Sequence, residues 1–111
     1  MDERAARIGQ NEALFRSINE NLEDLNDSLA PITGTFEVVC ECGALECAEQ
    51  LRLTPAEYES VRADPRLFVI RAGHSAPDVE NVVRAVDDYE IVRKREGEPA
   101  ALARNLDERS D

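Results

Sequence analysis

Apolar residues between positions 2 and 29 recur at alternating spacings of three and four, with one amide among them. That spacing places them on one stripe of an α-helix, and its alternation is the a/d pattern of a coiled coil. Pro31 follows directly, and both proline and the residue before it resist the helical state. The pattern therefore predicts one long amphipathic helix that ends before Pro31. Its stripe consists of Ile8, Asn11, Phe15, Ile18, Leu22, Leu25 and Leu29.

The stripe needs a covering surface, because an isolated helix with an exposed apolar seam is only marginally stable in water. It can lie on the helix's own domain, as most apolar helix stripes do. It can instead bind a protein partner or a second copy of the chain, and the residues that would bury most area in that contact are Phe15, Ile18, Leu22 and Leu25. Asn11 places an amide in the seam, which is the kind of residue that fixes register or partner number.

From Thr35 to Cys42 the pattern changes to a period of two, with Phe36, Val38, Cys40 and Cys42 on one side and Glu37, Val39 and Glu41 on the other, which predicts a strand. Because residues two apart on a strand point the same way, the sulfurs of Cys40 and Cys42 share one face. Gly43 then permits a turn through which Cys47 can fold back towards them. The period of the strand therefore predicts that three cysteines come together.

The remaining predicted elements are short. Thr54 can cap a helix and Glu57 completes a capping box, so a helix start is well marked there. Residues 79–95 are rich in strand formers, which favours a β-hairpin turning at Asp87-Asp88; a helix followed by a strand is the alternative. The other expected elements are a strand at 51–53, the capped helix to about residue 63, a buried strand at 67–70 and a C-terminal helix opened by Pro99.

The chain is strongly acidic. Asp and Glu outnumber Lys and Arg by 24 to 13 among 111 residues, which gives a formal net charge of −11, and the excess is spread along the chain. Such a surface repels nucleic acid and anionic lipid, so we expect no direct binding to either, whereas a basic protein partner is compatible. Neither a signal peptide nor a membrane span is recognisable, so we expect a cytoplasmic location. The carboxylates themselves are expected to be solvated surface charge.

Thiols in the cytoplasm are kept reduced, so three cysteines within eight positions indicate metal ligands or a redox device rather than disulfides. The only histidine, His74, follows an apolar run and makes a set of four with them. Three thiolates and a neutral imidazole form a closed tetrahedral site, which is typical of structural zinc. The sequence therefore predicts one zinc ion held by Cys40, Cys42, Cys47 and His74.

Other interpretations of these residues stay open. They could hold an iron–sulfur cluster, since thiolates are its usual ligands, or be ordinary buried cysteines beside a satisfied histidine. If His74 is not a ligand, Glu41, Glu46, Glu49 or a water could complete the shell and leave a zinc open for catalysis. No H-E-x-x-H motif, phosphate-binding glycine loop or Ser/His/Asp arrangement supports catalysis, so we predict that the chain is not an enzyme.

The order of the elements predicts an α+β fold. A long N-terminal amphipathic helix, residues 1–30, would precede a small domain, residues 31–111. That domain would consist of a small, mainly antiparallel sheet with short helices, clasped by zinc.

Several stretches resemble a family of small, largely uncharacterised actinobacterial proteins. The family pattern is C-E-C, then L-T-x-x-E-Y-x-x-V-R, then G-H and a valine-rich segment ending near Y-x-V-V. Its counterparts here lie at 40–42, 53–62, 73–74 and 89–92, and residues 7–16 also look similar. The resemblance implies that the cysteines and the Gly-His belong to one module, and it implies no particular activity. Ala72 stands where the family pattern has proline, so that turn is expected to be less rigid. Arginine supplies all but one of the 13 basic residues, which suits a GC-rich bacterial genome.

Together these features favour a non-enzymatic protein-interaction or regulatory module, with structural zinc and with the N-terminal helix as its contact element. A second hypothesis is an acidic inhibitor that imitates nucleic acid and occupies the basic groove of a polymerase or nuclease. A third is a thiol redox sensor that releases zinc on oxidation.

Overall fold

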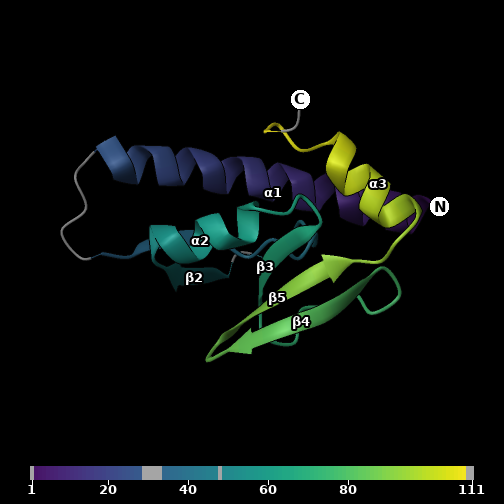
Figure 1. Ribbon diagram of the computed structural model, residues 1–111. Helices are drawn as coiled ribbons and strands as arrows, with labels where there is room; N and C mark the ends of the chain where they lie inside the picture. The colour runs from purple at the N-terminus through teal and green to yellow at the C-terminus, as the bar shows by residue number, and fades with distance from the viewer. Residues whose placement is uncertain (1, 29–33, 48, 110–111) are drawn as a thin grey trace.

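A computed structural model describes residues 2–28, 34–47 and 49–109 of the chain, and it has the predicted α+β fold. Figure 1 shows the long N-terminal helix along one side of the molecule, with the C-terminal helix beside its N-terminal part and a β-hairpin on the far side. The elements are α1 (Glu3–Ser28), β1 (Phe36–Val39), β2 (Gln50–Leu53), α2 (Pro55–Arg62), β3 (Leu67–Arg71), β4 (Glu80–Val86), β5 (Tyr89–Lys94) and α3 (Glu98–Asn105). The predicted end of the first helix, at Leu29 to Pro31, lies outside the described residues.

The strands form two small antiparallel sheets. One pairs β1 with β2, and the other has the order β3-β5-β4. The hairpin predicted for residues 79–95 is confirmed, and its turn lies at Asp87, where φ is +46°. The first sheet, the second sheet and α2 enclose the main core, which contains Phe36, Val38, Leu51, Leu53, Tyr58, Val61, Val69, Tyr89 and Ile91.

The predicted capping box of α2 is also confirmed. Thr54 Oγ1 accepts a hydrogen bond from the Glu57 amide at 3.0 Å, and Glu57 Oε1 accepts one from the Thr54 amide at 2.7 Å. The cap fixes where α2 begins, and with it which side chains face inward. Tyr58 and Val61 are buried as a result, and the Tyr58 hydroxyl reaches the segment that carries the cysteines.

The face of α1 that lies on the domain is largely polar. It consists of Ala5, Gly9, Glu12, Arg16, Asn19 and Glu23, which we call the docking face. These residues also recur at spacings of three and four, but each beyond Ala5 follows directly after a member of the predicted apolar stripe. One residue is a rotation of about 100° on a helix, so the apolar stripe is turned away from the middle of the contact. Phe15 and Leu22 are half-buried, whereas Ile18 and Leu25 are 38% and 57% exposed.

Arg16 is the centre of the docking face, and its side chain is almost fully buried. Its guanidinium donates to the carbonyl oxygens of Pro65 at 2.7 Å and Ala103 at 3.0 Å. It also lies over the Phe68 ring, with Cζ 4.6 Å from the ring centroid. One side chain thus ties α1 to the loop before β3, to β3 itself and to α3. A smaller device helps at Gly9, where an added Cβ would lie 2.6 Å from Leu102 Cδ2, so glycine lets α3 approach α1 closely.

Buried carboxylates correct one sequence expectation. Glu12, Glu41 and Glu80 are fully buried, although the many carboxylates were expected to be solvated surface charge. Lys94 Nζ donates to Glu12 Oε1 at 2.7 Å and to Glu80 Oε1 at 3.1 Å, which joins α1 to β4 and β5. The expectation was wrong because a carboxyl group can be buried when residues from distant segments bind it, and such partners are not visible in local sequence. The partner is Lys94 for Glu12 and Glu80, whereas neutral hydrogen-bond donors bind Glu41.

The Glu12–Glu80–Lys94 cluster predicts a pH dependence of stability. Burial, followed by the charge of Glu80, raises the pKa of Glu12 well above its ordinary value. A carboxyl whose pKa is raised in the folded state stabilises the fold fully below its unfolded pKa, and that contribution is lost as pH rises through the folded pKa. We expect Glu12→Gln, whose amide can donate to Glu80, to gain stability relative to the parent protein as pH increases from 5 to 8.

Urea unfolding of both proteins at each pH measures this difference. Glu3→Gln, an exposed acid on the same helix, serves as the matched control, and its difference from the parent should stay flat. Parallel pH profiles for Glu12→Gln and the parent would contradict the prediction.

Candidate metal centre

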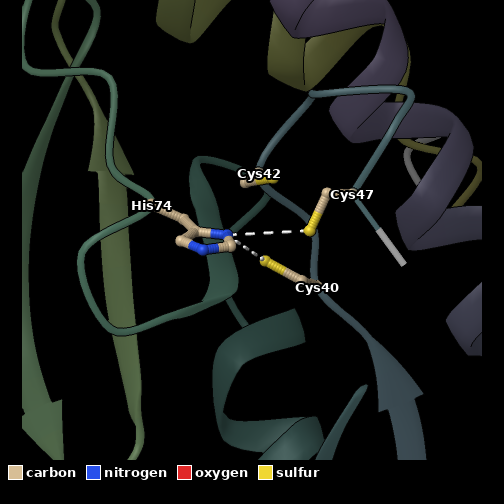
Figure 2. Close-up of side chains that lie close together, drawn as sticks. All are labelled: Cys40, Cys42, Cys47 and His74. Carbon is tan, nitrogen blue, oxygen red and sulfur yellow. Dashed lines mark hydrogen bonds between the residues drawn. The ribbon is translucent and has the colours of Figure 1, made fainter. Parts of the chain in front are cut away.

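The four predicted ligands come from two loops that the fold brings together. Cys40 follows β1 directly, Cys42 and Cys47 lie in the connection to β2, and His74 lies in the turn after β3. Their ligand atoms all lie within 4.8 Å of one another. Figure 2 shows the three sulfurs and the imidazole pointing towards a common centre. All three cysteines are free thiols.

The cysteines meet although the strand that was expected to align them is shorter than predicted. The Cys40 amide still donates to Glu49 O at 2.9 Å, next to β2, but the Glu41 amide donates to Val69 O in β3, also at 2.9 Å. The chain therefore crosses from one sheet to the other at this point. Gly43, with φ of +83°, then turns it back, and Cys47 returns to face Cys40.

Two distances within the cluster match those around a single tetrahedral metal ion. His74 Nδ1 lies 3.6 Å from Cys40 Sγ and 3.6 Å from Cys47 Sγ. Zinc–sulfur bonds of about 2.3 Å and zinc–nitrogen bonds of about 2.0 Å place sulfur and nitrogen about 3.5 Å apart across a tetrahedral angle. The Cys3His cluster can therefore hold a metal ion.

The imidazole presents Nδ1 to the thiols, and Figure 2 shows its other ring nitrogen turned away from them. A tight turn sets this orientation, because the His74 amide donates to Arg71 O at 3.0 Å and Gly73 has φ of +88°. The Gly73 amide also donates to Glu90 Oε1 at 3.1 Å, which ties the turn to β5. A metal on Nδ1 leaves the proton on Nε2, so the fold selects one tautomer.

Hydrogen bonds to sulfur prepare the thiols for a cation. The Arg71 amide donates to Cys40 Sγ at 3.1 Å. In the metal-free cluster the hydrogen bond with Cys40 lowers the pKa of Cys42 to about 5, and a backbone hydrogen bond from Ala44 acts in the same direction. The same thiol pair raises the pKa of Cys40, and burial raises that of Cys47. These interactions favour the thiolate form of Cys42, which is the form that binds a metal.

Glu41, between two of the cysteines, points away from the sulfurs into the interior. Its carboxylate accepts hydrogen bonds from Asn19 Nδ2 at 2.8 Å, from the Tyr58 hydroxyl at 2.9 Å and from the Val69 amide at 3.0 Å. Both oxygens are engaged, so Glu41 is not a candidate ligand. Sequence reasoning missed this role for Glu41 and Asn19. The available signal was the position of Glu41, which alternates with the cysteines in the predicted strand and therefore faces away from their sulfurs.

A pocket of about 500 Å³ opens beside the cluster. Cys42, Cys47 and His74 form part of its wall, and Glu46 and Glu49 line it without belonging to the ligand group. Cys47 is half-buried, whereas Cys40 is buried. Small solutes can therefore approach the cluster from one side.

Comparisons of the chain with protein-family models, with curated proteins and with solved structures find no match. Among the described residues, no helix is both long and apolar enough to cross a membrane. The Cys3His cluster and the outer surface of α1 are therefore the grounds for a functional proposal.

Proposed function

We propose that the chain is a zinc-stabilised, non-enzymatic protein-interaction or regulatory module whose N-terminal helix makes the contact. The observation that carries this proposal is the apolar surface left on α1, because the helix docks through a different face. Leu14, Ile18 and Leu25 are 51%, 38% and 57% exposed. Rows of exposed apolar side chains of this kind are typical of interaction sites, and the a/d spacing suits another helix as partner.

The ligand set supports zinc as the metal. Three thiolates and one imidazole are the ligands that zinc prefers, and four protein ligands leave no position for a substrate. The ligands of an iron–sulfur cluster surround several iron atoms, so a set within 4.8 Å suits a single ion better. The expected location is the cytoplasm, where reducing conditions would keep such thiols available for a metal. The resemblance to the actinobacterial family agrees with one module that contains the three cysteines together with Gly73-His74.

The structure offers less support for mimicry of nucleic acid. A mimic displays its carboxylates in an array that resembles phosphates. Here Glu12, Glu41 and Glu80 are turned into the interior and bound there. We therefore keep the interaction module as the proposal.

Charge placed on the exposed stripe tests the contact. We expect Ile18→Asp combined with Leu25→Asp to lose self-association or partner binding while keeping the metal, because both side chains lie outside the docking face and a buried unpaired carboxylate is costly. Mass by light scattering, partner capture and metal content are measured on the same samples.

The matched control is Asn81→Asp combined with Asn105→Asp, which adds the same charge at exposed polar positions outside α1. That variant should associate like the parent protein. If the parent is a monomer that captures no partner, or if both variants behave alike, the contact role of the stripe is wrong.

A redox sensor is a second candidate, and the open pocket beside Cys47 favours it. Because this thiol is within reach of small solutes, we expect mild peroxide to release zinc from the folded protein. A metallochromic dye follows the release while circular dichroism follows the fold. Release only after addition of denaturant would mean that the site is purely structural.

A further inference from the structure

We propose that docking of α1 is linked to the metal: an ion on Cys40, Cys42, Cys47 and His74 stabilises α1 on the domain, and its removal loosens α1. This inference rests on the proposed metal site and adds a regulation to it. The contacts that carry it join α1 to the cysteine loop, which we define as residues 40–47.

The first contact is between the tip of the cysteine loop and the N-terminal half of α1. Asn11 Nδ2 donates to Gly43 O at 2.9 Å. A Cβ on Gly43 would lie 2.9 Å from Ile8 O and 3.2 Å from Glu12 Cγ, so the loop backbone lies directly on the helix. Asn11, which the sequence assigns to a coiled-coil seam, thus uses its side-chain amide to bind the cysteine loop.

The second contact holds the beginning of the loop. Asn19 is fully buried, and its side-chain amide forms two hydrogen bonds with the backbone of Val39. The Val39 amide donates to Asn19 Oδ1 at 2.8 Å, and Asn19 Nδ2 donates to Val39 O at 2.8 Å. Asn19 Nδ2 also donates to Glu41 Oε2. One side chain of α1 therefore fixes the residues on both sides of Cys40.

Glu41 connects the metal position to α1. The thiols of Cys40 and Cys42 face the metal position, while the carboxylate between them faces the interior and binds α1, α2 and β3. The Cys40–Cys42 segment is thus held from both sides. When the metal leaves, Cys40 and Cys42 lose the ion that both of them bind. Glu41 and Gly43, which contact α1, are then held less firmly in place.

Linkage makes this coupling reciprocal: if the metal stabilises docking of α1, the docked α1 must raise metal affinity by the same factor. We expect Asn19→Ala to weaken Co²⁺ and Zn²⁺ binding about 10-fold, in the range seen when a partner of a ligand segment is removed. Asn11→Ala should act in the same direction, and its half-buried position makes loss of folding less of a concern.

The control is Arg66→Ala, which removes ion pairs with Asp64 and Glu96, and both of these partners lie outside α1 and outside the cysteine loop. It should lower the melting temperature and leave metal affinity unchanged. This comparison separates a specific link from general loss of stability.

The experiment uses the full chain. Metal affinity is measured by competition with a chelating dye and by the visible absorption of tetrahedral Co²⁺, and hydrogen exchange is measured with Zn²⁺ and after chelation. We expect chelation to speed exchange in residues 8–23 more than in the β4–β5 hairpin. Unchanged affinity in both asparagine variants, equal exchange of α1 with and without metal, or uniform exchange over the whole chain each overturns the link. A protein that takes up no metal at all instead refutes the metal site itself.

Discussion

Cys40→Ser is expected to remove the metal and to destabilise the fold by about 4 kcal/mol or more, which is the range associated with loss of a metal. Cys40 is 1% exposed and packs with Phe68, Ile70 and Val92, so the site lies inside a core cluster. Loss of the ion leaves its sulfur partners unbound within that cluster. Metal analysis and thermal unfolding on the same sample measure both effects, and a shift of about 15 °C or more is expected for a domain of this size.

His74→Ala should give the same loss of metal, whereas Glu46→Gln and Glu49→Gln should keep it. These two acids line the pocket, and the sequence offered them, with Glu41 and a water, as alternatives to His74 as fourth ligand. Retention of metal in His74→Ala together with its loss in a glutamate variant would assign the shell differently. A metal-free Cys40→Ser protein that melts like the parent would show that the fold does not depend on the ion.

The second large effect is expected at Arg16. Arg16→Met keeps most of the length of the side chain but leaves the carbonyls of Pro65 and Ala103 without their donor. Each unsatisfied buried group costs about 1–3 kcal/mol, and the lost cation–π contact with Phe68 adds up to about 2 kcal/mol. We therefore expect destabilisation of about 4 kcal/mol, measured as the shift in free energy of unfolding in urea.

Arg7→Met is the matched control, because Arg7 is exposed on the same helix. Substitutions at such surface positions usually change stability by less than about 0.5 kcal/mol. Equal unfolding midpoints for the two variants would mean that α1 is not held by its docking face.

The elements could be predicted from the sequence because each has a strong local signal. The capping box at Thr54 and Glu57, the buried run at 67–70 and the hairpin at 79–95 depend on neighbours a few residues away, and the structure has all three. The gathering of Cys40, Cys42 and Cys47 was predicted from strand period and a glycine turn, and the turn at Gly43 is present. However, β1 ends at Val39 and the Glu41 amide bonds to Val69 of β3, so a contact distant in sequence also places the sulfurs. Which nitrogen of His74 faces the sulfurs could not be predicted, since the turn that orients the ring depends on Arg71 and Glu90.

The orientation of α1 could not be predicted for a different reason. Hydrophobic periodicity marks a face as buried only when burial is apolar, and the docking face contains Glu12, Arg16 and Asn19. Their partners lie 20 to 87 positions away in sequence, at Val39, Lys94 and Ala103 among others. Nothing local distinguishes such residues from solvated surface, so the pattern identified the helix and its apolar stripe but not the face on which the helix rests.

The separation of two faces on α1 has an evolutionary consequence. The residues that hold α1 on the domain and the residues that are exposed to solvent are different ones. Arg16 and Asn19 face inward, whereas Leu14, Ile18 and Leu25 are exposed. Substitutions at these exposed positions are therefore expected to change stability little, so this surface of α1 can vary in sequence while the helix stays docked. The docking face has no such freedom, because its hydrogen bonds to fixed carbonyl groups would be broken if the helix slid or rotated.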